Sequence, residues 1–300
     1  MRGILLMAYG GPSSPDQIEA YFTHIRGGRK PSQEQLDDLV GRYRAIGGAS
    51  PLLGITNKQA AGLEHAILSN GGNTHVYAGM KHSPPFIADV MRQVKPEGVT
   101  DMLCIALAPH FSGISIGGYA KAVDEGNSKL DSPLRITFVK SWHTNPKLLS
   151  MWARRISEAG KVIGSDASLV FSAHSLPERI LREGDPYKDQ LLETSTLIAG
   201  QAGWKDWSFT FQSQSRTGEP WLGPDILDHL QTLYENGKRR FISAPIGFVS
   251  DHLEILYDID IECKDWARQK EVELVRCESP NDSDEMIATL LDIAKANGFA

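Results

Sequence analysis

Short apolar runs alternate with longer amphipathic segments along all 300 residues, and this alternation constrains the fold more than any other feature. The candidate strands are short and rich in apolar and β-branched residues: 3–9, 74–80, 102–109, 134–140, 168–174, 208–213, 241–247 and 272–277. Helical patterns separate them, among them 15–25, 55–68, 145–160, 190–203, 224–237 and 284–298. Regular β–α alternation predicts an α/β protein with parallel sheets covered by helices.

The chain is long enough for two domains, each with its own core. The eight strands divide into two four-stranded parallel sheets, with the break near Ser141. We therefore expect one domain of residues 1–140 plus a C-terminal helix at 281–300, and a second of residues 141–280. Polar or aromatic side chains follow several strands: Tyr9, His82, His110, His174 and Asp251–Glu254. Ligands in open α/β sheets bind beyond the carboxyl ends of strands, which predicts one interdomain cleft.

The composition excludes several classes of protein. A net charge of −6 without a long Lys/Arg run argues against binding nucleic acid. Cys104, Cys263 and Cys277 show no CxxC spacing, so neither a zinc knuckle nor a disulfide framework is predicted, and a reducing, cytoplasmic compartment is expected. No apolar run approaches the length of a membrane-spanning helix, and the apolar N-terminal run is too short for a signal peptide.

Three carboxylates follow at four-residue spacing after the seventh strand: Glu254, Asp258 and Glu262. On a regular helix they line one face along roughly 12 Å of its axis. Like charges at this spacing weaken a helix, so the ladder does not serve helix stability. It fits a track for cations or protons, with His174 at the end of the fifth strand as its partner.

Each of these residues also has a structural interpretation. His174 is either a metal ligand or general base, or a buried histidine bonded to the backbone or to Ser172 or Ser175. With Asp251 as N-cap, Glu254 completes a pattern like a capping box. That interpretation does not account for the other two acids. The role of His252 is left open.

A basic region punctuated by glycines lies near the N-terminus. It contains Arg26, Arg29, Lys30, Arg42 and Arg44. Arginine suits carboxylate or phosphate recognition because its planar fork donates two hydrogen bonds at once, although a solvated loop and helix face is the alternative. The interspersed apolar residues are Phe22, Tyr43, Ile46 and Leu52. This mixture fits a large, flat, anionic ligand.

Other common α/β functions lack their motifs. No G-x-G-x-x-G follows a strand and no GxxxxGK[ST] is present, so dinucleotide or P-loop nucleotide binding is not supported. GxSxG is also absent, which leaves a hydrolase elbow unsupported.

Eight motifs occur in order nearly from end to end: MAYGGP, IRGGRKP, RYRAIGGASPL, GMKHSPPFI, LAPHFSGISIGGY, SAHSLPE, QSQSRTGEPWLGPD and APIGFVSDHLEILYDIDIEC. Together they resemble the ferrochelatase family, most closely the Gram-positive type that acts on coproporphyrin III. The resemblance implies two Rossmann-like domains, a porphyrin cleft between them, and insertion of Fe²⁺, as a substrate, into the macrocycle.

The resemblance also implies residue roles. His174 and Glu254 match the inner metal-site pair, with His174 accepting pyrrole protons or helping to deliver iron. Asp258 and Glu262 continue the acidic track toward solvent. Tyr9 matches the axial ligand of the product iron on the opposite side, and its motif indicates coproporphyrin III as substrate. The positions matching those that hold the macrocycle and its propionates are Arg26, Arg42, Tyr43, Ser50 and Tyr119.

Two positions depart from the family pattern. Gly27 stands where relatives often carry a second arginine, and Phe22 stands where a tyrosine is frequent. These departures put details of the propionate contacts in doubt, but not the class.

The resemblance further implies cofactors and partners. No cofactor is expected to be permanently bound, and three unclustered cysteines are too few for the [2Fe–2S] cluster of some relatives. Whether a second cation such as Mg²⁺ occupies Asp258 and Glu262 is left open. The expected partners are coproporphyrin III, Fe²⁺ and neighbouring enzymes of the haem pathway, and the expected state is a monomer.

Three rivals remain at this point. One is a ferrochelatase acting on protoporphyrin IX, and another is a cobalt or nickel chelatase of the same fold, because these residue types bind several divalent ions. The third is a non-catalytic haem or porphyrin carrier. A carrier would need Tyr9 and the arginines, but not an acidic ladder next to a histidine.

Overall fold

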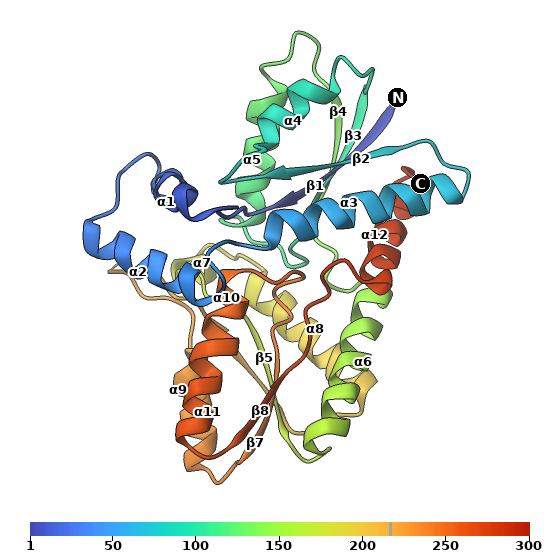
Figure 1. The fold of residues 1–300 in the computed structure, drawn as a ribbon. Helices are drawn as coiled ribbons and strands as arrows, with labels where there is room; N and C mark the ends of the chain where they lie inside the picture. The colour runs from blue at the N-terminus through green and yellow to red at the C-terminus, as the bar shows by residue number, and fades with distance from the viewer. Residues whose placement is uncertain (216–217) are drawn as a thin grey trace.

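The computed structural model describes residues 1–215 and 218–300 and contains two four-stranded parallel sheets (Figure 1). The first has the order β2-β1-β3-β4 and consists of β1 (Arg2–Ala8), β2 (His75–Met80), β3 (Asp101–Ala106) and β4 (Arg135–Val139). The second has the order β6-β5-β7-β8 and consists of β5 (Ser168–His174), β6 (Trp207–Gln212), β7 (Arg240–Ala244) and β8 (Glu273–Arg276). The predicted α/β class and all eight predicted strands are confirmed.

Both sheets place their first strand in the interior, and the burial of these strands explains their sequences. From Ile4 to Met7, β1 is inaccessible to solvent, and Leu169 to Phe171 of β5 is equally buried. A strand covered on both faces reads as a continuous apolar run rather than an alternating one.

The helices connect the strands and cover the sheets. In the first half they are the 3₁₀-helix η1 (Pro15–Gln17), α1 (Ile18–Ile25), α2 (Gln33–Ala45), α3 (Leu52–Ser69), α4 (Ile87–Val94) and α5 (Ile116–Asn127). In the second half they are α6 (Pro146–Ile163), α7 (Arg179–Arg182), α8 (Tyr187–Ala202), α9 (Ile226–Glu235), α10 (Leu253–Leu256), the π-helix η2 (Asp258–Cys263), α11 (Lys264–Gln269) and α12 (Asp284–Ala296). Figure 1 shows α1 and α2 projecting to one side of the molecule.

Local sequence signals set several of these boundaries. The side chain of Ser32 accepts from the backbone N–H of Gln35, and Gln35 reaches back to complete a capping box at the start of α2. Asn145 caps α6, and Pro146 follows at its first position.

One hydrophobic cluster joins the two sheets. Ile4 and Leu103 from the first sheet share it with Phe171 and Ile242 from the second, and Trp152 of α6 lies in it, fully buried. The last helix, α12, contacts α3, which flanks the first sheet, and α6, which flanks the second. The predicted domain limits stay a prediction. No helix within residues 1–215 and 218–300 is long and apolar enough to cross a membrane.

Candidate active site

The carboxyl ends of β1 and β5 open onto one cavity of about 600 Å³. The structure brings eight of the predicted site residues to its wall: Tyr9, Arg42, Tyr43, Ser50, Tyr119, His174, Glu254 and Asp258. Two predicted residues, Arg26 and Glu262, are not part of this wall. Of the side chains expected at the strand ends, Tyr9, His110, His174 and Glu254 line the cavity, whereas His82 and Asp251 do not.

His174 and Glu254 form the centre of the site. His174 ends β5 and Glu254 lies in α10, and the distance from Nε2 to Oε1 is 3.4 Å. The other ring nitrogen, Nδ1, faces the carbonyl oxygen of Ser175, which fixes the orientation of the ring. About a third of each side chain is exposed to the cavity, so both are accessible to a ligand.

The pair is charged at neutral pH. Burial lowers the pKa of His174, but the Glu254 carboxylate and the Ser175 carbonyl outweigh burial and raise it to about 9. Burial raises the pKa of Glu254, yet His174 and His252 together hold it well below its usual range. With the pKa values shifted in these directions, an imidazolium faces a carboxylate at neutral pH.

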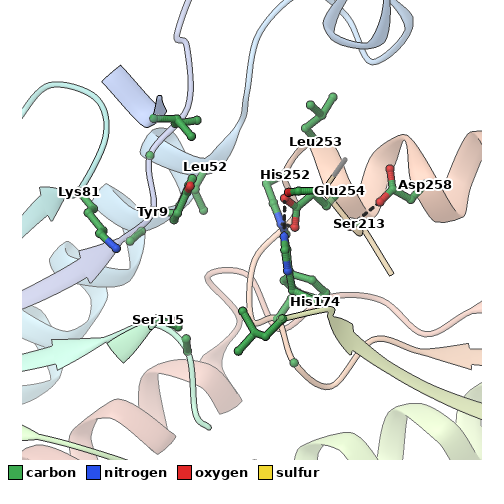
Figure 2. A pocket seen from close by; sticks show the side chains of 18 of the residues that line it. Tyr9, Leu52, Lys81, Ser115, His174, Ser213, His252, Leu253, Glu254 and Asp258 are labelled. Atoms are coloured by element: carbon green, nitrogen blue, oxygen red, sulfur yellow. Dashed lines mark hydrogen bonds and ion pairs between the residues drawn. The ribbon is translucent and has the colours of Figure 1, made fainter. Parts of the chain in front are cut away.

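His252 is the second histidine at Glu254, and the sequence left its role open. Its Nε2 lies 3.5 Å from Oε2 of Glu254, and its Nδ1 lies 2.9 Å from the carbonyl oxygen of Ser250. The carboxylate of Glu254 therefore stands between two imidazoles, one on each oxygen. Figure 2 shows both rings directed at Glu254.

The acidic ladder does not lie on one regular helix. The segment breaks into α10, the π-helix η2 and α11, and the backbone N–H of Glu262 bonds to the carbonyl of Tyr257, five residues earlier. The alternative interpretation of Glu254 as part of a capping box is wrong, because His252 is the N-cap and its side chain makes no cap hydrogen bond, while Asp251 accepts from Ser279. A π-helical turn is rare in proteins and is frequently found at functional sites.

Asp258 is buried beside Glu254, and its carboxylate has a hydroxyl and a guanidinium as neighbours. Its Oδ2 accepts a 2.5 Å hydrogen bond from the hydroxyl of Ser213, and Nη1 of Arg42 lies 4.0 Å from Oδ1. Burial, and then the charge of Glu254, raise the pKa of Asp258 to about 7, against the effect of Ser213. Burial also raises the pKa of Glu262. Asp258 is therefore poised to gain and lose a proton near neutral pH.

The opposite wall carries Tyr9. Figure 2 shows Tyr9 and Lys81 across the open space from His174 and Glu254. Burial, and then the charge of Glu254, raise the pKa of the Tyr9 phenol to about 12. The ring of His82 packs against Tyr9 with a centroid distance of 4.5 Å, behind the cavity wall. Lys81 places its ammonium 5.9 Å from the Tyr9 ring centroid and 5.3 Å from that of Tyr119.

The predicted substrate-holding residues fall into two groups. Arg42 faces the cavity from α2, with its guanidinium over the ring of Tyr257 at 5.0 Å. Tyr43 and Ser50 line the same side. Arg26 instead lies outside the wall, over the ring of Phe22 at 5.6 Å.

Some residues of the cavity wall were not assigned a role from the sequence. Lys81 and Ser213 line the cavity and stand within two of the quoted motifs, but no spacing pattern singled them out. His110, predicted at the cleft, does line it, but its Nε2 is engaged at 3.0 Å by the hydroxyl of Thr194. Arg216 and Thr217, which lie within one of the quoted motifs, are outside the described residues.

Metal-binding clusters of the usual kind are not found in the described ranges, where no group of three or more His, Cys, Asp and Glu side chains is arranged to hold an ion. All three cysteines are buried and free. The expectation that the chain carries no [2Fe–2S] cluster stays a prediction.

Comparison with known proteins decides the family. The family model described as Ferrochelatase matches residues 1–297. The chain belongs to the ferrochelatase family. It is therefore an enzyme, a metal chelatase of the lyase class. Enzymes of this family use Fe²⁺ as a substrate. The resemblance found in the sequence is confirmed.

Curated relatives match over nearly their full length. The chain is 46% identical to the coproporphyrin III ferrochelatase of Halalkalibacterium halodurans, covering 97% of this chain and 95% of the relative. It is 44% identical to the coproporphyrin III ferrochelatase of Bacillus subtilis, covering 97% and 96%. It is also 44% identical to a ferrochelatase of Herpetosiphon aurantiacus, covering 96% of each.

Solved structures share the fold at low identity. SirB from Bacillus subtilis with Fe³⁺ superposes with a TM-score of 0.62 at 13% identity, covering 99% of this chain and 98% of that one. CbiX, a terminal enzyme of sirohaem biosynthesis in denitrifying bacteria, superposes with a TM-score of 0.59 at 14% identity, covering 98% and 99%. These likenesses support the two-sheet architecture.

Proposed function

We propose that this chain inserts Fe²⁺ into coproporphyrin III, giving coprohaem. The observation that carries the proposal is the charged His174–Glu254 pair, 3.4 Å apart on one wall, with Tyr9 on the other. A cavity of about 600 Å³ suits a ligand of the size of a macrocycle. Relatives at 42–46% identity that bear the name coproporphyrin III ferrochelatase support the choice of substrate.

The charges of His174 and Glu254 give an order of events. An incoming dication takes the place of the His174 imidazolium beside the Glu254 carboxylate. Its positive charge lowers the pKa of the imidazole, which therefore loses its proton. The neutral imidazole is a base for the pyrrole protons of the macrocycle. Since no larger group of His, Cys, Asp and Glu side chains is arranged to hold an ion in the described part of the chain, water and then the pyrrole nitrogens supply the rest of the coordination.

Protons leave by the acidic side of the site. Asp258, with a pKa of about 7, accepts and releases a proton at neutral pH, and Glu262 follows it toward solvent. Arg42 already places a cation 4.0 Å from Asp258. We therefore favour a proton-carrying role for this pair over a Mg²⁺ site.

Tyr9 supplies the ligand on the far face. A phenol with a pKa of about 12 is neutral at pH 7, and it ionises when a metal ion comes within bonding distance. Arg42, Tyr43, Ser50 and Tyr119 hold the macrocycle and its propionates from the same cavity. Arg26 would have to reach the propionates from outside the cavity wall.

The substrate is tested by comparing Fe²⁺ insertion into coproporphyrin III and protoporphyrin IX under anaerobic conditions. A clear preference for coproporphyrin III supports the proposal, and a preference for protoporphyrin IX overturns it. Parallel reactions with Co²⁺ and Ni²⁺ test the rival metal chelatases. A chain that binds coproporphyrin III but inserts no metal is a carrier. We further propose a cytoplasmic monomer, with neighbouring haem-pathway enzymes as partners, tested by sedimentation and by fractionation of cells.

A further inference from the structure

Arg276 ties together two parts of the chain that flank the acids of the site. It is the last residue of β8, and only 12% of its side chain is exposed. Nη2 donates to Oδ2 of Asp260 at 2.7 Å and Nε to the same oxygen at 3.0 Å. Nη1 donates to Oδ1 of Asp251 at 3.3 Å. One guanidinium fork therefore holds two carboxylates at once.

Asp251 makes further hydrogen bonds to other parts of the fold. The hydroxyl of Ser279 donates to Oδ1 of Asp251 at 2.7 Å, and the side-chain amide of Asn281 donates to Oδ2 at 2.9 Å. Asn281 also accepts from the backbone N–H of Asp251 at 2.8 Å. Gln59 of α3 donates to the carbonyl of Asn281 at 2.7 Å, so a helix beside the first sheet supports this end.

The Asp260 end lies inside the π-helix η2. Lys264 adds a second cation to Asp260, with Nζ 2.7 Å from Oδ1. Glu254 and Asp258 lie between the two tied residues in the sequence, and both side chains line the cavity.

This segment holds an arrangement that is unfavourable on its own. A π-helical turn is rare, and the charge of Glu254 raises the pKa of Asp258, which means that the two acids repel when both are ionised. The backbone therefore needs ties from outside the segment to keep both carboxylates directed at the cavity. Arg276 is the residue that reaches both sides of them.

We propose that Arg276 is a positioning residue for metal insertion, which acts through Asp251 and Asp260 to fix Glu254 and Asp258 in the cleft. The inference rests on the proposed function, since it assigns the tied segment to the handling of Fe²⁺. Residues that hold the macrocycle, such as Arg42 and Ser50, come from other elements. Loss of Arg276 is therefore expected to affect the metal and to spare the porphyrin.

The test uses Arg276→Gln and the milder Arg276→Lys in the full chain. Outer partners of metal-handling groups typically change metal affinity by roughly 10- to 100-fold, so we expect Arg276→Gln to raise KM for Fe²⁺ by about tenfold or more. The Kd for coproporphyrin III, measured by fluorescence quenching, should stay unchanged. The KM of Arg276→Lys for Fe²⁺ should lie between those of the wild type and Arg276→Gln. Equal losses for metal and porphyrin, or an unchanged KM for Fe²⁺, overturn the inference.

Arg240→Gln is the matched control. Arg240 starts the neighbouring strand β7 at the opposite end of the same sheet and pairs with Asp166. Arg240→Gln should leave the KM for Fe²⁺ and the Kd for coproporphyrin III unchanged. If Arg276→Gln does not fold, Asp260→Asn removes the charge at one tie only and is expected to show the same split between metal and porphyrin.

Hydrogen exchange separates this inference from the proposed function, because it needs no substrate. Amides of residues 253–263 should exchange faster in Arg276→Gln or Arg276→Lys than in Arg240→Gln, with the sheets unaffected. Unchanged exchange in this segment overturns the positioning role. A wild-type chain that inserts no Fe²⁺ overturns the proposed function, whatever the exchange result.

Discussion

Nε2 of His174 lies 3.4 Å from Oε1 of Glu254, although the first residue ends β5 and the second follows β7. They meet because β5 and β7 are parallel neighbours in one sheet, so their carboxyl ends open at the same edge. The contact joins an imidazolium to a carboxylate, so under the proposed function a dication that binds Glu254 displaces the proton of His174. This relationship underlies the first prediction.

Replacing either member of the pair should stop metal insertion and spare porphyrin binding. For His174→Ala and Glu254→Gln we expect the rate of Fe²⁺ insertion to fall by roughly 10²- to 10⁴-fold, because a positioned base or its partner is lost. Absorbance follows insertion and fluorescence quenching follows binding. His65→Ala, on the exposed face of α3, is the control. Variants that metallate coproporphyrin III at the wild-type rate would show that the pair is not the metal site.

Tyr9→Phe should keep the free porphyrin bound and change the iron product. The phenylalanine ring retains the packing against His82, where the ring centroids are 4.5 Å apart, but lacks the oxygen that we propose as the iron ligand. We expect the absorption and electron paramagnetic resonance spectra of the ferric coproporphyrin complex to lose their phenolate signature. Identical spectra for the variant and the wild type would exclude Tyr9 as the axial ligand.

Asp258→Asn should stabilise the protein at alkaline pH. The pKa of Asp258 is about 7 in the folded protein against an ordinary value of 3.8, so the folded state binds this proton more tightly. The stability that Asp258 contributes is therefore present below pH 3.8 and is lost as pH rises through 7. Asparagine does not ionise, so the variant keeps this stability at high pH. Its free energy of unfolding should exceed that of the wild type by ~1–3 kcal/mol at pH 8 but by little near pH 4. Urea unfolding at both pH values measures the difference; an equal gain at both would refute the assignment.

Gly247→Ala should destabilise the edge of the sheet beside His174. A Cβ at Gly247 would lie 2.4 Å from Cβ and 2.8 Å from Cα of Ala173, and a backbone atom cannot move aside cheaply. We expect a loss of ~1–3 kcal/mol in the free energy of unfolding, together with slower insertion. Gly200→Ala, inside α8 and with open space around it, should instead be neutral or stabilising. Equal effects of the two substitutions would contradict the close approach.

The central strands could be predicted because they are buried on both faces and therefore read as short apolar runs, as in Ile4 to Met7. His174 and the acids could be predicted because they follow such runs. The shape of the acidic segment could not. Four-residue spacing fits a regular helix, and it reports neither the π-helical turn nor the hydrogen bonds that Arg276 of β8 donates to Asp251 and Asp260.

The sequence by itself determined the α/β class, the order of strands and helices, and the family, because these depend on local periodicity and on motifs read along the chain. Only the tertiary structure decided the charge of His174, which depends on Glu254 and on burial. It alone also placed Lys81 in the cleft and left Arg26 outside it. Electrostatic interactions act through space over a few ångströms, and spacing along the chain does not report those distances.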